Sequence, residues 1–177
     1  MILFLDFDGV LHPDAAYYER GRPVLRADGE LFMWAPILVD MVRPFPELKI
    51  VLSTSWVRVL RFDRARRCLP QELQPRVIGA TWHTAMARHP EGSHRIHDWF
   101  TTATRYEQIA RYVACGGASA LDWLAIDDDV RGWSEVDRRR LVATDGQVGL
   151  SDVTTQLELQ RKLQQLHNGT SLLPEGE

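Results

Sequence analysis

The sequence predicts an α/β fold, with an open, mostly parallel sheet and helices on both of its faces. Short apolar runs at residues 2–5, 48–52 and 121–126 have the length of buried strands, and polar or turn-forming residues follow each one. Stretches with apolar residues at helical spacing lie between these runs. Strand-like and helix-like segments that alternate along a chain are typical of a parallel sheet covered by helices.

This alternation extends over most of the chain. We expect strands at residues 2–5, 48–52, 76–81, 121–126 and 141–144, and helices at 35–43, 56–67, 104–114 and 152–166. Pro36 suits the first turn of a helix, because a proline there loses no intrahelical hydrogen bond. Ser151 is the expected N-terminal cap of the last helix, since its hydroxyl can accept a hydrogen bond from a free backbone N–H.

We expect one domain over residues 1–167, followed by a loose tail at 168–177. Residues 12–33 and 83–103 are rich in proline, glycine or polar side chains and are too long for simple connections. We interpret these two segments as small lids, which leaves the site with a small or absent cap.

The composition excludes several classes of protein. Hydrophobic residues make up 45% of the 177 residues and charged residues 25%, as in ordinary globular domains. A net charge of −3 gives no overall electrostatic reason to bind nucleic acid. Cys68 and Cys115 lack metal-ligand spacing, so we expect reduced thiols and a cytoplasmic location. The sequence shows no signal-peptide pattern, no membrane-spanning run and no sign of an obligate protein partner.

Polar side chains follow three of the predicted strands at the point where each strand ends. They are Asp6 and Asp8, the hydroxyl group Ser53, Thr54 and Ser55, and the pair Asp127 and Asp128. The carboxyl ends of parallel strands share one edge of a sheet, so we expect these groups to converge there. Clustered carboxylates need a cation, and Mg²⁺ prefers such oxygen ligands. The set suits phosphoryl transfer, in which a carboxylate attacks phosphorus and forms an aspartyl-phosphate.

The segment Asp6-Phe7-Asp8-Gly9-Val10 resembles the first motif of the haloacid dehalogenase (HAD) superfamily, the aspartate-nucleophile phosphohydrolases with a Rossmann-like core. The resemblance implies that Asp6 is the nucleophile and also contacts the metal ion. It implies that Asp8 protonates the leaving oxygen and then activates water, with Asp8 counted among the candidate metal ligands.

Two further segments resemble motifs of this superfamily. Residues 50–55 are similar to the second motif, an apolar strand that ends in Ser or Thr. Thr54 is preferred as the phosphate-binding hydroxyl and Ser53 is next, but the register within Ser53–Ser55 stays open. Residues 124–128 are similar to the fourth motif, which implies that Asp128 binds the metal ion and Asp127 supports it.

The third motif supplies a cation, usually lysine, near the start of the helix before the acid pair. The sequence has no lysine between Lys49 and Lys162, and Arg105 is the best substitute. An arginine keeps the charge and can bind a carboxylate or phosphate with two N–H groups, but it differs from lysine in reach. The other reading of Arg105 is an ordinary surface ion pair.

The flanking segments 43–56 and 76–81 are similar to a small HAD-domain group associated with RNA-repair proteins. Residues 124–129 are also similar to the phosphatase half of polynucleotide kinase-phosphatases. These resemblances imply an Mg²⁺-dependent phosphomonoester hydrolase whose substrate is a phosphorylated small molecule or a nucleic-acid end. The missing lysine keeps an alternative open, a non-catalytic module that binds phosphate or nucleic acid.

Several other residues have both a functional and a structural interpretation. An arginine-rich segment at 58–67 is either a basic rim for a phosphate backbone or a solvated helix face. The tryptophans at 56, 82 and 99 either stack bases or pack in the core. The histidines at 83, 89, 94 and 97 lack the spacing of a zinc site, and we expect His12 to serve loop structure.

Overall fold

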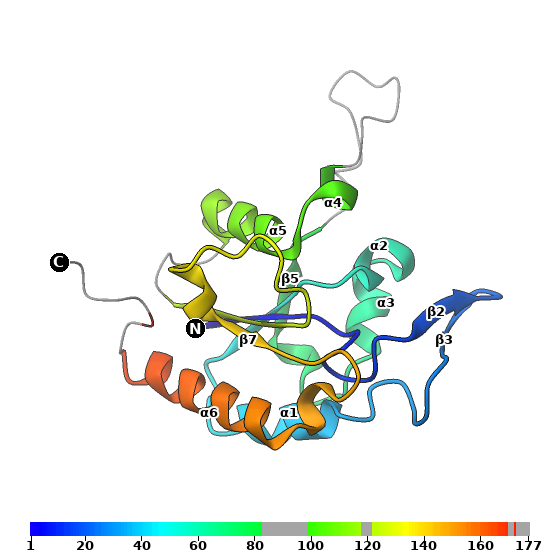
Figure 1. Ribbon diagram of the computed structural model, residues 1–177, viewed down its shortest axis with the longest axis horizontal. Helices are drawn as coiled ribbons and strands as arrows, with labels where there is room; N and C mark the ends of the chain where they lie inside the picture. The colour runs from blue at the N-terminus through cyan, green and yellow to red at the C-terminus, as the bar shows by residue number, and fades with distance from the viewer. Residues whose placement is uncertain (83–98, 118–121, 170–171, 173–177) are drawn as a thin grey trace.

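The computed structural model describes residues 1–82, 99–117, 122–169 and 172 (Figure 1). Its main sheet is entirely parallel and has the strand order β5-β4-β1-β6-β7. The strands are β1 (Ile2–Leu5), β4 (Lys49–Leu52), β5 (Val77–Ala80), β6 (Trp123–Asp127) and β7 (Leu141–Ala143). Strand β1 lies in the centre, with Leu5 in register with Leu52 on one side and Ile126 on the other. The predicted α/β fold with a parallel sheet is therefore confirmed.

Helices cover both faces of the sheet, and Figure 1 shows α1 and α6 on the side opposite to α5. The helices are α1 (Ala35–Val42), α2 (Trp56–Leu60), α3 (Phe62–Arg67), α4 (Trp99–Thr102), α5 (Arg105–Tyr112) and α6 (Val153–His167). Short turns of other helical types lie at Gln74–Arg76, Val113–Gly117, Asp137–Arg140 and Gly149–Ser151. None of the described helices is long and apolar enough to span a membrane.

The strands are apolar throughout because both faces of the sheet are buried. Leu3 and Leu5 belong to the larger core, which also includes Leu38 of α1 and Leu159 of α6. On the opposite face, Phe4 belongs to a smaller cluster with Ile109 of α5, Trp123, Ala125 and Trp133. Successive side chains of one strand therefore enter different cores.

Two local predictions are wrong. The helix expected at 56–67 is two helices, because Arg61 has φ +72° and interrupts the helical backbone between α2 and α3. The cap of the last helix is Asp152 and not Ser151. The Asp152 carboxylate accepts a hydrogen bond of 2.9 Å from the Thr155 N–H, while Ser151 is part of the turn Gly149–Ser151.

The segment 12–33 contains an antiparallel hairpin of β2 (Ala16–Glu19) and β3 (Arg22–Leu25). Its two turn residues, Arg20 and Gly21, both have positive φ, as tight hairpin turns require. Of the other expected lid, 83–103, residues 83–98 and their four histidines lie outside the described residues. Most of the expected tail from residue 170 on lies outside them too.

Candidate active site

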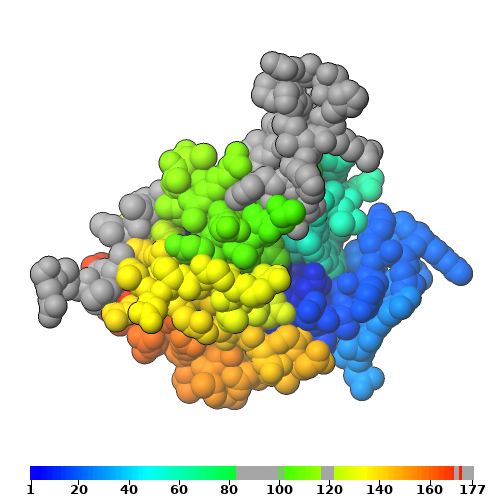
Figure 2. Space-filling view, turned by 45° about the horizontal axis from the view of Figure 1, so that its top comes forward, coloured from blue at the N-terminus to red at the C-terminus, as the bar shows by residue number. Residues whose placement is uncertain are grey.

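Three carboxylates meet at the carboxyl end of the central strands. Asp6 follows β1, while Asp127 ends the neighbouring strand β6 and Asp128 follows it. One oxygen from each carboxylate lies within 4.8 Å of the other two. Asp6 is 3% exposed and Asp127 is 0% exposed. In Figure 2 the start of the chain, in dark blue, reaches the surface in a hollow beside the blue hairpin and the teal α2–α3 region.

Arg105 is the cation of this cluster. Helix α5 begins at this residue because Thr104 caps it: the Thr104 hydroxyl accepts from the Glu107 N–H, and the Glu107 carboxylate accepts from the Thr104 N–H. Arg105 Nη2 donates to Asp6 Oδ2 at 3.1 Å. Its Nε lies 3.0 Å from Asp127 Oδ2. The arginine therefore lies against two buried acids and is not a surface ion-pair residue.

The positive charge of Arg105 does not balance the three acids. Burial raises the pKa of Asp6, and burial together with Asp6 raises the pKa of Asp127 well above its usual value. Burial and the neighbouring Asp6 raise the pKa of Asp128 to about 7. Burial disfavours the charged form of Arg105, but Asp6 and Asp127 outweigh this and raise the arginine pKa. Without a second cation, the cluster therefore tends to retain protons near neutral pH.

The donor set of the cluster fits a hard divalent cation. All of its ligand atoms are carboxylate oxygens, the type that Mg²⁺ prefers. Asp127 Oδ1 accepts from the Asp129 N–H at 2.9 Å, whereas the buried Asp127 Oδ2 accepts no hydrogen bond from the described residues. Gly9 has φ +65°, and a Cβ there would lie 2.5 Å from Asp128 Oδ2. A glycine is therefore required where the first motif turns against Asp128.

The three hydroxyl residues after β4 are placed differently. The Thr54 hydroxyl is a hydrogen-bond partner of Asp6 that lowers the aspartate pKa, and Thr54 Oγ1 also accepts from the Trp56 N–H at 3.3 Å. Ser53 Oγ is buried and has no hydrogen-bond partner among the described residues, while Ser55 is exposed. Thr54 is therefore the hydroxyl that lies beside the first acid.

Asp8 lies apart from the three clustered acids and has its own partners. Its Oδ2 accepts from Trp56 Nε1 at 2.8 Å, and its Oδ1 lies 3.1 Å from His12 Nε2. His12 is 0% exposed, and its Nδ1 accepts from the Phe32 N–H at 3.4 Å. This assigns the imidazole proton to Nε2, which donates to Asp8. The sequence predicts neither partner: it indicates only a loop role for His12, and no sequence signal connects Trp56 with Asp8.

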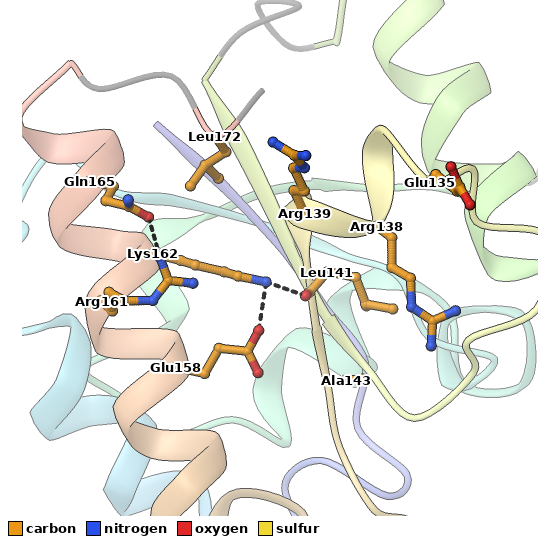
Figure 3. Close-up of a pocket in the computed structure, with 10 residues that line it drawn as sticks. All are labelled: Glu135, Arg138, Arg139, Leu141, Ala143, Glu158, Arg161, Lys162, Gln165 and Leu172. Carbon is orange, nitrogen blue, oxygen red and sulfur yellow. Dashed lines mark hydrogen bonds and ion pairs between the residues drawn. The ribbon is translucent and has the colours of Figure 1, made fainter. Parts of the chain in front are cut away.

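A cavity with a volume of about 600 Å³ lies elsewhere, between β7 and α6 (Figure 3). Arg138, Arg139 and Arg161 border it, and Lys162 lies at its base. Lys162 Nζ donates to the Leu141 carbonyl at 2.5 Å and pairs with Glu158 at 2.7 Å. The acids of the first and fourth motifs do not line this cavity, so it is separate from the candidate active site.

A parallel sheet whose central strand ends at a buried aspartate, with an acid pair after the neighbouring strand, defines a HAD-like domain. The family model for the HAD domain in Swiss Army Knife RNA repair proteins matches residues 2–155. The chain therefore belongs to this family, as its flanking segments predicted. No curated protein and no solved structure matches it. The match covers all the site residues described above and ends within α6.

Proposed function

We propose that this protein is an Mg²⁺-dependent phosphomonoester hydrolase that removes phosphate from nucleotides or nucleic-acid ends through an aspartyl-phosphate. The single observation that carries the proposal is the position of Asp6. Its buried carboxylate ends the central strand, contacts Arg105 and shares an oxygen cluster with Asp127 and Asp128. Membership of a family of HAD domains from RNA repair proteins supports a substrate related to nucleic acid.

In the proposed reaction, an Asp6 carboxylate oxygen attacks phosphorus and the bond between phosphorus and the leaving oxygen breaks. Asp8 gives its proton to that oxygen, and the free alcohol departs. Asp8 then takes a proton from the water that attacks the aspartyl-phosphate, which releases inorganic phosphate and restores Asp6. During both steps the Thr54 hydroxyl donates a hydrogen bond to a phosphate oxygen, and the Arg105 guanidinium offsets the negative charge of the phosphate.

Asp6, Asp127 and Asp128 would hold the metal ion, whose contribution is to neutralise the acids and the phosphate oxygens together. Asp8, which the resemblance counts among the metal ligands, is proposed here for proton transfer. Its two oxygens already contact Trp56 and His12, an arrangement that orients the carboxylate.

The test is phosphate release from an aryl phosphate and from oligonucleotides with a 3′- or 5′-phosphate, with and without Mg²⁺. We expect Mg²⁺-dependent turnover by the wild type and none by Asp6→Asn. Asp63→Asn is the matched control, because it removes a carboxylate from the exposed surface of α3. A lack of turnover by the wild type across the whole panel would refute the hydrolase function.

The second candidate function is a non-catalytic module that binds phosphate or nucleic acid. The specific observation in its favour is that Arg105 stands in place of the usual lysine and contacts oxygens of both Asp6 and Asp127. This candidate predicts Mg²⁺-dependent binding of phosphorylated oligonucleotides without turnover. Isothermal titration calorimetry with wild-type protein, followed by analysis of the recovered oligonucleotide for lost phosphate, separates the two functions.

A further inference from the structure

We propose that the β2–β3 hairpin and α2 form a stacking subsite for the nucleobase next to the phosphate that is removed. This inference rests on the proposed function, because it specifies where the leaving group of the proposed reaction binds in the same site. The ring would lie against Tyr18, with its sugar directed toward Asp8. The chemical class of substrate is then a nucleoside monophosphate or the terminal nucleotide of an RNA, and not a phosphorylated small molecule without a ring.

The subsite is a cavity that adjoins Asp8. The hairpin provides Ala16, Tyr17, Tyr18 and Pro23, and α2 provides Val59 and Leu60. Tyr18 is paired with Pro23 across the hairpin, and Ala16 lies two residues before Tyr18 on the same face. The hairpin face with Tyr18 therefore looks onto α2 across the cavity. Tyr17 and Val24 are paired on the other face, from which Tyr17 also borders the cavity and Val24 does not.

The cavity is open to solvent, and its walls combine apolar side chains with Asp8 and Ser55. Tyr18 is 49% exposed and Val59 is 53% exposed, so both are accessible to a ligand. The Tyr18 hydroxyl donates to the Gly21 carbonyl at 3.0 Å, so the ring is held by its own hairpin turn. A ring fixed before binding loses little conformational entropy when a base stacks on it.

Trp56 lies both at the edge of this cavity and against Asp8, the proposed proton donor. It borders the cavity and donates its indole N–H to Asp8 at 2.8 Å. Phe7, His12 and Phe32 pack edge-on against its ring and fix its position. Because Asp8 is the proposed donor to the leaving oxygen, a group that occupies the space beside Asp8 and Trp56 is the leaving group. For a nucleotide, that group is the nucleoside.

The dimensions favour partial enclosure of a flat ring. The cavity has a volume of about 90 Å³. This is less than the roughly 150 Å³ of an apolar cavity that takes up benzene, so the cavity covers one side of a base and leaves the other in solvent. An open subsite of this kind accommodates the rest of an RNA chain and tolerates different bases, because every base has a face that stacks.

The experiment compares a nucleoside 3′-monophosphate with glycerol phosphate, which has no ring. For Tyr18→Ala we expect KM for the nucleotide to rise about tenfold, since stacking on one aromatic side chain has that magnitude, while KM for glycerol phosphate stays constant. Tyr18→Phe keeps the ring and loses only the hydrogen bond to Gly21, so its KM for the nucleotide should stay close to the wild-type value and well below that of Tyr18→Ala. Val24→Ala, on the other hairpin face, controls for damage to the hairpin. Equal effects of Tyr18→Ala on both substrates, or no effect on either, would overturn the subsite.

A binding measurement separates this inference from the proposed function. Isothermal titration of Asp6→Asn with the same two ligands and Mg²⁺ requires no turnover. Tighter binding of the nucleotide, lost in Tyr18→Ala, supports the subsite even if the wild type hydrolyses nothing. Equal binding of both ligands, or binding of neither, refutes it even if the wild type is a phosphatase. Titration of a 3′-phosphorylated oligonucleotide in the same series shows whether the terminal nucleotide of an RNA binds more tightly than a free nucleoside monophosphate.

Discussion

Arg105 and Asp6 are 99 residues apart in the sequence, yet Arg105 Nη2 lies 3.1 Å from Asp6 Oδ2. The contact brings the first turn of α5 to the end of the central strand β1. It gives the proposed nucleophile a permanent cationic neighbour. Arg105 thus supplies a positive charge at this edge of the sheet, in a segment of the chain that has no lysine.

Replacement of Arg105 tests that contact. We expect Arg105→Met to lower kcat/KM about 100- to 1,000-fold, the usual cost of removing a donor that stabilises developing charge. Arg105→Lys keeps the charge and should recover part of the loss, although an ammonium group lacks the planar, multi-donor geometry of the guanidinium. Steady-state kinetics of the two variants provide the measurement. Full activity of Arg105→Met would show that the guanidinium takes no part in the reaction.

The acid cluster predicts a stability that depends on pH when no metal ion is bound. The pKa of Asp128 is raised from 3.8 to about 7 in the folded protein, and the pKa values of Asp6 and Asp127 are raised as well. Between pH 3.8 and about pH 7, the folded state binds more protons than the unfolded state. The free energy of unfolding therefore falls as pH rises through this range. We expect Tm in EDTA to decrease from pH 4.5 to pH 7.5.

Two additions sharpen this pH measurement. Asp128→Asn should flatten the dependence because it removes one of the groups that titrates in this range. Mg²⁺ should raise Tm most at the upper end of the range, where the acids are most fully ionised. A Tm in EDTA that rises steadily through the same range would contradict the assigned direction of these pKa shifts.

Trp56→Phe tests the orientation of Asp8. The change keeps an aromatic ring but removes the N–H that donates to Asp8 Oδ2 at 2.8 Å. A hydrogen bond to a charged group has a net value of about 1.5–3 kcal/mol, so we expect kcat to fall about tenfold or more with little change in KM. Trp123→Phe is the matched control, since that buried indole lies at the start of β6 in the other core cluster. Equal losses in both variants would mean a general structural effect.

Lys162→Met should lower stability without lowering activity. The Lys162 ammonium group is buried and donates to the Leu141 carbonyl, and its loss leaves that carbonyl and Glu158 without their partner. We expect a decrease of about 1–3 kcal/mol in the free energy of unfolding. Urea denaturation provides the value. A loss of kcat at temperatures where the variant is folded would contradict this prediction and would show that Lys162 contributes to catalysis.

The features that the sequence predicts correctly follow local rules. A buried parallel strand is apolar on both faces, so β1, β4 and β6 are recognisable as short apolar runs. The residue after such a run lies at the edge of the sheet, and this rule alone brings Asp6 and Asp127 together. Membership of the HAD domains of RNA repair proteins was recognisable for the same reason, since its motifs follow strands.

The features that escaped prediction depend on tertiary contacts or on choices between similar neighbours. Trp56 donates to Asp8 across 48 positions of sequence, and no periodicity marks such a pair. Ser151 and Asp152 are both good capping residues, and only the preceding turn decides between them. At Arg61 the chain adopts a positive φ that its side chain does not favour, which propensity alone does not reveal.

The central claim is that Asp6 accepts the phosphoryl group, and its most direct test is a covalent one. Wild-type protein is mixed with a 3′-phosphorylated oligonucleotide and Mg²⁺, quenched in acid within one turnover, and analysed by peptide mass spectrometry. We predict a phosphoryl group on Asp6 that hydroxylamine removes and that is absent from Asp6→Asn. Phosphate release at the wild-type rate by Asp6→Asn, or a phosphoryl group on another residue, would contradict the claim.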